Sequence, residues 1–326
     1  MIVSLAQRLC LGLAMFLPVA CSAVGHLEMA VTFDDLPLNR AESLPLTDQR
    51  GITADLLAAL IDRGIPSTGF VNEMRLFDGD SLMDGQVELL RLWLGAGQDL
   101  GNHTYSHPDL HRVGLDPFLD DIVKGERVTR PLAAMSGRPL RYFRHPFLHT
   151  GRDLETKHAV ESFLAEMGYK VAPVTVDNSE WIFARAYDMA IARSDNALRQ
   201  RVGQDYVDYM MAMVEYYESQ SLLLFERRIR QVLLLHANRI NADWFGRLAD
   251  RLTRRGYRFI TLDRALEDPV YQLPDRYTGP GGITWIHRWA ITRGTDPALF
   301  EGEPEAPDYV LDITSLQEHS YQRSED

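Results

Sequence analysis

The stretch LEMAVTFDD, residues 27–35, is an apolar run that ends in two adjacent carboxylates, Asp34 and Asp35. Its composition predicts a strand over residues 27–33. Active sites of barrel-type α/β folds lie at the C-terminal ends of the strands, where this pair stands. A single Asp there usually only forms a turn. Two adjacent carboxylates repel each other unless a cation lies between them, so the pair favours one metal-binding acid and one free base.

Short apolar runs alternate with amphipathic segments from residue 27 to about residue 266. This alternation is typical of βα units, so we predict an α/β protein with a mostly parallel sheet or barrel. The predicted strands are residues 27–33, 67–71, 98–102, 142–144, 169–176, 231–235 and 258–262. The predicted helices are residues 52–63, 87–94, 116–135, 154–167 and 244–255.

Two segments lie outside this alternation, a helical insertion at about 184–228 and a C-terminal extension at 269–326. We interpret the Tyr and Met stripe of the insertion as core packing. Prolines and glycines recur in the extension and break regular elements, so we expect it to wrap a main domain of residues 27–268 and to end disordered. In the extension, Trp285 and Trp289 either stack on sugar faces or pack against the barrel.

The composition limits the partners of the chain. Its 326 residues carry a formal net charge of -12, with 45% hydrophobic and 25% charged residues. These fractions are ordinary for a globular protein, and the length allows a large core. The negative charge argues against nucleic acid or an anionic membrane surface as the main partner.

The N-terminus has the pattern of a secretory signal peptide over residues 1–23, which is too short for a comfortable membrane span. We therefore expect an exported protein, periplasmic, secreted or held at the cell envelope. Cleavage after Ala23 would release it, whereas cleavage before Cys21 would leave a lipid anchor. The only other cysteine is Cys10, so the mature domain has no disulfide and any metal site must use His, Asp and Glu.

The motif HTYSH, residues 103–107, places His103 and His107 four positions apart, directly after a predicted strand. Residues at this spacing lie on one face of a helical turn, so the two imidazoles can close on one ion. A lone His is more often structural, but a pair at this spacing favours metal. Two histidines and one carboxylate with open coordination positions form a hydrolytic zinc site rather than a structural one. The chain is thus predicted to be a metal-dependent hydrolase.

Two further polar residues follow predicted strands. Arg144, in the sequence RHPF, is either an ordinary surface arginine or a buried guanidinium that holds a carboxylate by bidentate hydrogen bonds. Pro146 would stiffen the next turn, so that the Phe147 N–H could serve as an oxyanion donor. His236 ends a strongly apolar run, where it is either a buried structural residue or an acid–base group that titrates near neutral pH.

Taken together, these motifs resemble the polysaccharide deacetylase family, the NodB-homology domains of family 4 carbohydrate esterases. The matching pieces, in the family's order, are Thr32-Phe33-Asp34-Asp35, His103-Thr104-x-x-His107, Arg144-x-Pro146-Phe147, Asp177-x-x-Glu180-Trp181 and Leu235-His236. Three positions depart from the family pattern: Leu36 replaces a glycine, His145 a proline and Glu180 an aspartate. These departures leave the chemistry in place and bear on the substrate.

The resemblance implies a distorted (β/α) TIM-like barrel and a divalent metal, most readily Zn²⁺, bound by Asp35, His103 and His107. It also implies catalytic roles for four residues: Asp34 as general base, His236 as general acid, Arg144 as tether of the base and Phe147 as oxyanion donor. Three more residues, Asp177, Glu180 and Trp181, would support His236 or Arg144.

The function implied by the resemblance is hydrolysis of N-acetyl groups on a GlcNAc-containing glycan such as chitin or peptidoglycan, with release of acetate. Two alternatives stay within enzymes, namely an O-acetyl esterase acting on acetylated xylan and a deacylase of small amides. A non-catalytic glycan-binding protein is the alternative from another class. It is disfavoured because Asp34 and His236, which such a protein could lose, are both present.

Overall fold

The structure is a computed structural model that describes residues 27–41 and 43–315. The predicted signal peptide, its lipidation site at Cys21 and the last residues of the C-terminal extension lie outside the described residues. Within the described residues, no helix combines the length and the apolar character needed to cross a membrane.

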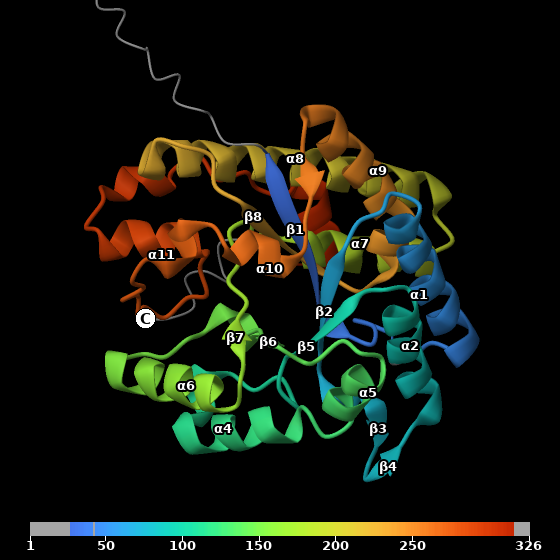
Figure 1. The fold of residues 1–326 in the computed structure, drawn as a ribbon. Coiled ribbons are helices and arrows are strands. Elements are labelled where there is room, and N and C mark those ends of the chain that lie inside the picture. The colour runs from blue at the N-terminus through green and yellow to red at the C-terminus, as the bar shows by residue number, and fades with distance from the viewer. Residues whose placement is uncertain (1–26, 42, 316–326) are drawn as a thin grey trace, which may run out of the picture.

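A parallel sheet forms the centre of the molecule, with the strand order β7-β6-β5-β2-β1-β8 and with β9 paired to the start of β1 (Figure 1). Its longest strand is β1, which is buried along nearly its whole length, as a central parallel strand requires. The strands are β1 (Glu28–Leu36), β2 (Ser67–Val71), β5 (Asp99–Asn102), β6 (Tyr142–Phe143), β7 (Lys170–Val171), β8 (Gln231–His236) and β9 (Arg258–Phe259). A separate antiparallel pair consists of β3 (Phe77–Asp78) and β4 (Ser81–Leu82).

The segment after β7 closes this sheet into a distorted barrel. Val176 bridges to Leu233 of β8, which lies at the opposite end of the strand order from β7. The strand predicted over residues 169–176 is therefore split, because it leaves β6 after Val171 and meets β8 five residues later. Pro173 lies in the gap and has no N–H to donate to a neighbouring strand. The predicted α/β barrel is confirmed by this strand order.

Helices surround the sheet (Figure 1). They are α1 (Leu46–Ile61), α2 (Asp84–Gly95), α3 (Leu110–Val113), α4 (Leu115–Lys124), α5 (Thr129–Met135), α6 (Leu154–Glu166), α7 (Glu180–Ala192), α8 (Asn196–Phe225), α9 (Arg239–Arg255), α10 (Leu262–Leu266), α11 (Trp285–Thr292) and α12 (Asp308–Thr314). Short 3-10 turns lie at η1 (Glu73–Leu76), η2 (Pro146–Leu148), η3 (Pro269–Gln272) and η4 (Pro297–Phe300).

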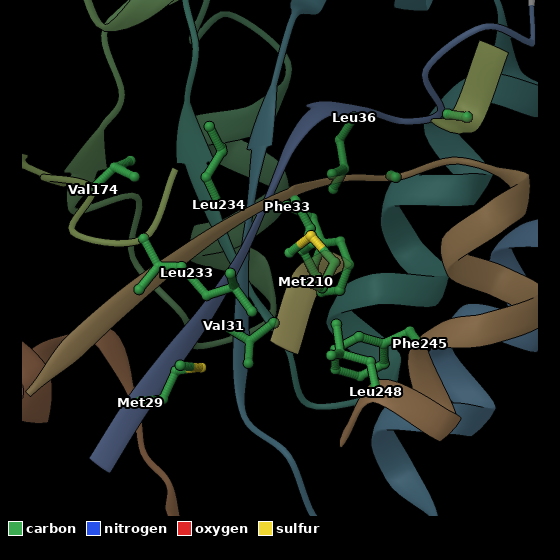
Figure 2. Close-up of a cluster of buried hydrophobic side chains, with 14 of the residues drawn as sticks. Met29, Val31, Phe33, Leu36, Val174, Met210, Leu233, Leu234, Phe245 and Leu248 are labelled. Atoms are coloured by element: carbon green, nitrogen blue, oxygen red, sulfur yellow. The ribbon is translucent and has the colours of Figure 1, made fainter. Parts of the chain in front are cut away.

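The main hydrophobic core lies between β1, β8 and the helices α8 and α9. Figure 2 shows Phe33 of β1 and Leu233 of β8 among side chains that include Met210 and Phe245. The ring of Phe33 packs against Phe245 with a centroid separation of 5.6 Å. The Tyr and Met side chains of α8 are almost fully buried, so their interpretation as core packing is confirmed.

Two further predictions about regular structure are wrong. The helix predicted over residues 116–135 is divided into α4 and α5, because the Glu73 carboxylate accepts the backbone N–H groups of Val128 at 3.0 Å and Thr129 at 2.5 Å and so caps the start of a separate helix. The C-terminal extension is not devoid of regular structure, since it forms α11 and α12 despite its prolines. Within α11, Trp285 and Trp289 are 8% and 1% exposed, so both pack against the protein and leave no face for a sugar.

Candidate metal and acid–base site

The two histidines of the HTYSH motif are brought together by a loop rather than by the predicted helical turn. Thr104 and His107 have φ values of 68° and 57°, in the left-handed region that non-glycine residues seldom adopt. The carboxylate of Asp121 fixes this loop by accepting the N–H groups of Tyr105 and Ser106, each at 2.8 Å. The Thr104 hydroxyl accepts the His107 N–H at 3.0 Å. The ring centroids of His103 and His107 are 4.8 Å apart.

Asp35, His103 and His107 converge at the C-terminal ends of β1 and β5, and one potential ligand atom of each lies within 4.8 Å of the others. The Nε2 atoms of both imidazoles are 3.8 Å from Oδ1 of Asp35. These separations exceed a hydrogen bond and lie near the roughly 3.4 Å expected between two ligand atoms of one tetrahedral zinc ion. The three residues predicted to bind metal therefore share one site.

The protonation of these groups fits a divalent cation. Burial lowers the pKa of both His103 and His107 to about 4, so each ring carries a free lone pair at neutral pH. His103 donates its Nδ1–H to the Arg144 carbonyl at 2.8 Å, which leaves Nε2 as the available ligand. Burial raises the pKa of Asp35, but the two imidazoles and nearby cationic groups outweigh it and hold that pKa low. Oδ1 of Asp35 is buried without a hydrogen-bond partner, as an oxygen reserved for a metal would be.

The other oxygen of Asp35 is held by a residue that sequence reasoning missed. Asn39 donates its side-chain N–H to Oδ2 of Asp35 at 2.5 Å, and Arg75 approaches the same oxygen at 3.8 Å. The Asn39 backbone N–H in turn donates to the Ala237 carbonyl at 2.6 Å. Asn39 follows the cis peptide bond Leu36-Pro37, in a loop whose path no local pattern predicts. The carboxylate is thereby oriented with Oδ1 toward the imidazoles.

Arg144 is buried, as the functional interpretation expects, but its predicted bidentate grip on Asp34 is wrong. One amino group, Nη1, reaches Oδ2 of Asp34 at 3.4 Å, whereas Nη2 donates to the Thr32 hydroxyl at 3.0 Å. Thr32 lies two positions before Asp34 on the same face of β1, so the guanidinium contacts two side chains of that strand at once. Burial raises the pKa of Asp34, and the charge of Arg144 opposes that rise.

His236 is paired with Glu180. Of the two residues that Glu180 was predicted to support, His236 and Arg144, the structure pairs it with His236. The Nδ1–H of His236 donates to Oε2 of Glu180 at 2.8 Å, and Glu180 is fully buried. Oε1 of Glu180 accepts from Asn238 at 2.5 Å and from Asn241 at 2.9 Å. Burial lowers the pKa of His236, but the Glu180 contact and the nearby charges of Asp35 and Asp34 raise it to about 9.

His236 is also the register partner of Asp34 between β1 and β8, so the two acid–base candidates stand side by side at the strand ends. The role of Asn238 and Asn241 was missed, although the sequence carries a signal for Asn238. It is the N-cap of α9, where its side chain accepts the Asn241 N–H, and Asn is a favoured residue at that position.

The remaining predicted residues lie around this centre. Burial raises the pKa of Asp177 to about 6, while the charges of His236 and Arg144 oppose the rise. Trp181 is partly buried and packs against the core at the start of α7. Phe147 is 53% exposed, and its ring lies 4.5 Å from that of His107.

A second group of potential ligands is formed by Asp109, His111 and His149. The rings of His111 and His149 are stacked, with centroids 3.9 Å apart and planes 8° from parallel. Because imidazole lone pairs lie in the ring plane, two parallel rings cannot both aim at one ion. His111 is also engaged at both nitrogens, Nδ1 with the Pro280 carbonyl at 3.2 Å and Nε2 with the Gly151 N–H at 3.3 Å. This arrangement does not fit a metal.

The fold and the donor set define a class of protein, an α/β barrel whose strand ends carry a candidate cation site of two histidines and one carboxylate beside two acid–base candidates. Residues 24–172 match the family model described as polysaccharide deacetylase, which confirms the family resemblance seen in the sequence. That stretch includes Asp34, Arg144 and Phe147 together with the three metal-binding candidates, whereas Glu180 and His236 lie beyond it.

Curated relatives carry related descriptions. A peptidoglycan-N-acetylglucosamine deacetylase of Bacillus cereus is 32% identical over 154 residues, which are 47% of this chain and 46% of that protein. A chitin deacetylase of Arthroderma benhamiae is 25% identical over 241 residues, which are 74% of this chain and 52% of that protein. The chain therefore spans about half the length of each of these two relatives.

Among solved structures, a family 4 carbohydrate esterase from Streptomyces lividans in complex with acetate aligns with a TM-score of 0.46 and 21% identity. The alignment covers 73% of this chain and 95% of that one. Because this score is low, the fold class rests on the strand order of the chain itself.

Proposed function

We propose that this protein is a metal-dependent deacetylase that hydrolyses N-acetyl groups of a GlcNAc-containing polysaccharide or oligosaccharide. The observation that carries the proposal is the convergence of Asp35, His103 and His107, with neutral imidazoles and an unpartnered carboxylate oxygen, beside Asp34 and His236. A divalent cation held there would polarise the acyl carbonyl and lower the pKa of a water molecule.

In this proposal Asp34 is the general base. Its Oδ1 is buried and has no hydrogen-bond partner, so it is free to accept the proton of the attacking water. Arg144 holds the other oxygen and favours the charged form of the carboxylate, whereas burial makes it more basic. The water oxygen bonds to the acyl carbon as its proton passes to Asp34.

His236 is the general acid. With a pKa of about 9 it is protonated at neutral pH, and Glu180 holds the proton on Nδ1, so Nε2 carries the proton that can be given away. As the bond between the acyl carbon and nitrogen breaks, the amine takes that proton and acetate is released. Phe147 would donate its backbone N–H to the oxygen that becomes negative in the transition state.

The substrate class is supported by the relatives, whose descriptions name peptidoglycan and chitin as their targets. Such polymers lie outside the cytoplasm, which agrees with the signal peptide predicted over residues 1–23. We propose that the protein is exported, with Cys21 as the lipid attachment site if cleavage occurs before it. The intact mass of the mature protein distinguishes a lipidated N-terminus from one that starts after Ala23.

The function is tested by measuring acetate release from chitooligosaccharides, peptidoglycan and acetylated xylan, with added zinc and after chelation. We expect release from the N-acetylated glycans that chelation abolishes and zinc restores. Release from xylan alone would favour the O-acetyl esterase, and release from small amides alone the small-amide deacylase. Sugar binding that survives chelation without any acetate would favour a binding protein.

Two substitutions test the acid–base pair. Asp34→Asn and His236→Ala should each lower the rate by about two to four orders of magnitude while the zinc content stays unchanged. Asp250→Asn is the matched control, because Asp250 is an exposed acid paired with Arg63 on the surface. Rates close to wild type in both site variants would refute their assigned roles.

A further inference from the structure

The loop of residues 145–151, which we call the Phe147 loop, is held in a strained conformation next to the candidate metal site. Phe147 and Leu148 have φ values of 56° and 55°, two consecutive left-handed residues with side chains. A residue with a side chain is unfavourable in this conformation and persists there only where the surroundings impose it. The strained segment places the Phe147 ring against His107, so its conformation bears directly on the site.

Arg288 of α11 supplies one set of these constraints. Its side chain is fully buried and donates from Nη2 to the Leu148 carbonyl and from Nη1 to the Thr150 hydroxyl at 2.7 Å. Nε donates to the Ile283 carbonyl at 2.9 Å, so all three guanidinium nitrogens have partners. One arginine thus connects the Phe147 loop to the C-terminal extension.

The charge of Arg288 is balanced inside the protein. Oδ2 of Asp275, also in the extension, lies 3.4 Å from Nη1 of Arg288 and accepts from Lys157 at 2.7 Å. The Lys157 ammonium group is buried and lies 3.2 Å from the Thr150 hydroxyl. This network joins two buried cations to the Asp275 carboxylate, with Glu161 3.6 Å from Lys157 on its exposed side, and it meets the Phe147 loop at Thr150.

The backbone of the C-terminal extension also packs closely against the Phe147 loop at Gly282. A Cβ built on Gly282 would lie 1.8 Å from the Phe147 carbonyl oxygen, so only glycine fits there without displacing that peptide. The neighbouring Gly281 has open surroundings, since its Cβ would meet nothing nearer than the Tyr277 hydroxyl at 4.0 Å. Adjacent glycines therefore differ sharply in what a methyl group would disturb.

His111 forms a third connection. It accepts the Gly151 N–H at Nε2 and donates its Nδ1–H to the Pro280 carbonyl, which fixes it as a neutral ring between the end of the loop and the extension. Its ring stacks on His149, and His149 is paired with Asp109 at 2.7 Å. The stacked pair, which does not fit a metal, thus connects the end of the Phe147 loop to the C-terminal extension.

We propose that Gly282 and Arg288 of the C-terminal extension are positioning residues that set the Phe147 backbone for transition-state stabilisation. This inference rests on the proposed deacetylase function and deepens it, because it makes the extension a working part of the site. The donors of an oxyanion site must stand at a fixed place before the reaction begins, and losing one costs about 10²–10³-fold in kcat. The C-terminal extension holds the Phe147 backbone at that place.

The experiment compares Gly282→Ala with Gly281→Ala in the full mature chain. We expect Gly282→Ala to lower kcat about 100-fold, with KM and zinc affinity changed less than about 3-fold, and Gly281→Ala to behave as wild type. Arg288→Lys keeps the charge but not the planar fork that spans Leu148 and Thr150, and it should lower kcat in the same way. A normal kcat in folded Gly282→Ala and Arg288→Lys would overturn the proposal.

A second readout separates this proposal from the proposed function. Amide hydrogen exchange of residues 145–151 should be faster in Gly282→Ala than in Gly281→Ala, whether or not the protein has activity. Equal exchange in the two variants would show that the extension does not hold the loop. Failure of the wild-type chain to release acetate from any glycan would overturn the deacetylase function. The exchange comparison would still decide whether the C-terminal extension holds the Phe147 loop.

Discussion

The ion pair between Glu180 and His236 predicts that the effect of removing the Glu180 charge on kcat depends on pH. A purely structural role of Glu180 would not predict this dependence. Glu180→Gln keeps the size of the side chain but removes the negative charge 2.8 Å from Nδ1 of His236. Without that charge, the pKa of His236 should fall from about 9 toward its ordinary value of about 6.5 or lower, because burial favours the neutral ring. The general acid would then be deprotonated at the pH where the wild type works.

The magnitude follows from the two pKa values. At pH 8 a histidine with a pKa of about 9 is roughly 90% protonated, and one with a pKa of about 6.5 is roughly 3% protonated, so the protonated fraction of His236 in the metal-free protein falls about 30-fold and kcat should fall in the same direction. At pH 6 both forms are mostly protonated, and the two rates should agree within about twofold.

The assay is acetate release from a chitooligosaccharide between pH 5.5 and 9.5, with zinc at saturation and the Asp250→Asn variant as control. A direct check is the NMR titration of the His236 ring in both proteins. If the loss of rate in Glu180→Gln were the same at pH 6 and pH 8, or if the ring titrated unchanged, the assignment of His236 as a Glu180-supported acid would be wrong.

Three other outcomes follow from the contacts described above. Asn39→Ala removes the donor that orients Asp35 and should weaken zinc binding about 10–100-fold, measured by competition with a chelator, with no change in fold. The pKa of His236 is higher in the folded than in the unfolded state, so the stability that its protonation contributes is complete below about pH 6.5 and is lost as the pH rises through 9. The free energy of unfolding in urea should therefore drop by about 2–3 kcal/mol between these pH values. His236→Asn should not show this drop. Trp289→Ala should cost about 3–5 kcal/mol of unfolding free energy, since the ring is 1% exposed and packs edge-on against its neighbours; a loss of sugar binding without a loss of stability would contradict the packing role.

The sequence predicts the frame of the site because strand ends are marked by a change from apolar to polar residues. The strand predicted over residues 67–71 coincides with β2, and Asp34 and His236 each follow an apolar run. Parallel strands gather their C-terminal ends at one edge, so residues far apart along the chain meet without further information. That is why Asp35, on β1, and His103, after β5, could be placed together from the sequence.

Other features depend on contacts that no local pattern carries. The HTYSH spacing suggested a helical turn, but Asp121, 15 residues beyond Ser106, imposes a loop with left-handed residues instead. Asn39, which holds Asp35, and Leu148, which Arg288 holds, both lie in irregular backbone, where side-chain periodicity gives no guide. The split grip of Arg144 depends on a neighbouring hydroxyl whose role only the packed structure reveals.

The central claim is that Asp35, His103 and His107 hold one divalent cation, and anomalous diffraction at the zinc edge tests it most directly. Crystals of the mature protein grown with zinc should show an anomalous peak about 2.0–2.2 Å from one oxygen of Asp35 and one nitrogen of each imidazole. A zinc peak at Asp109, His111 and His149 instead, or none at the strand ends of a zinc-soaked crystal, would contradict the account.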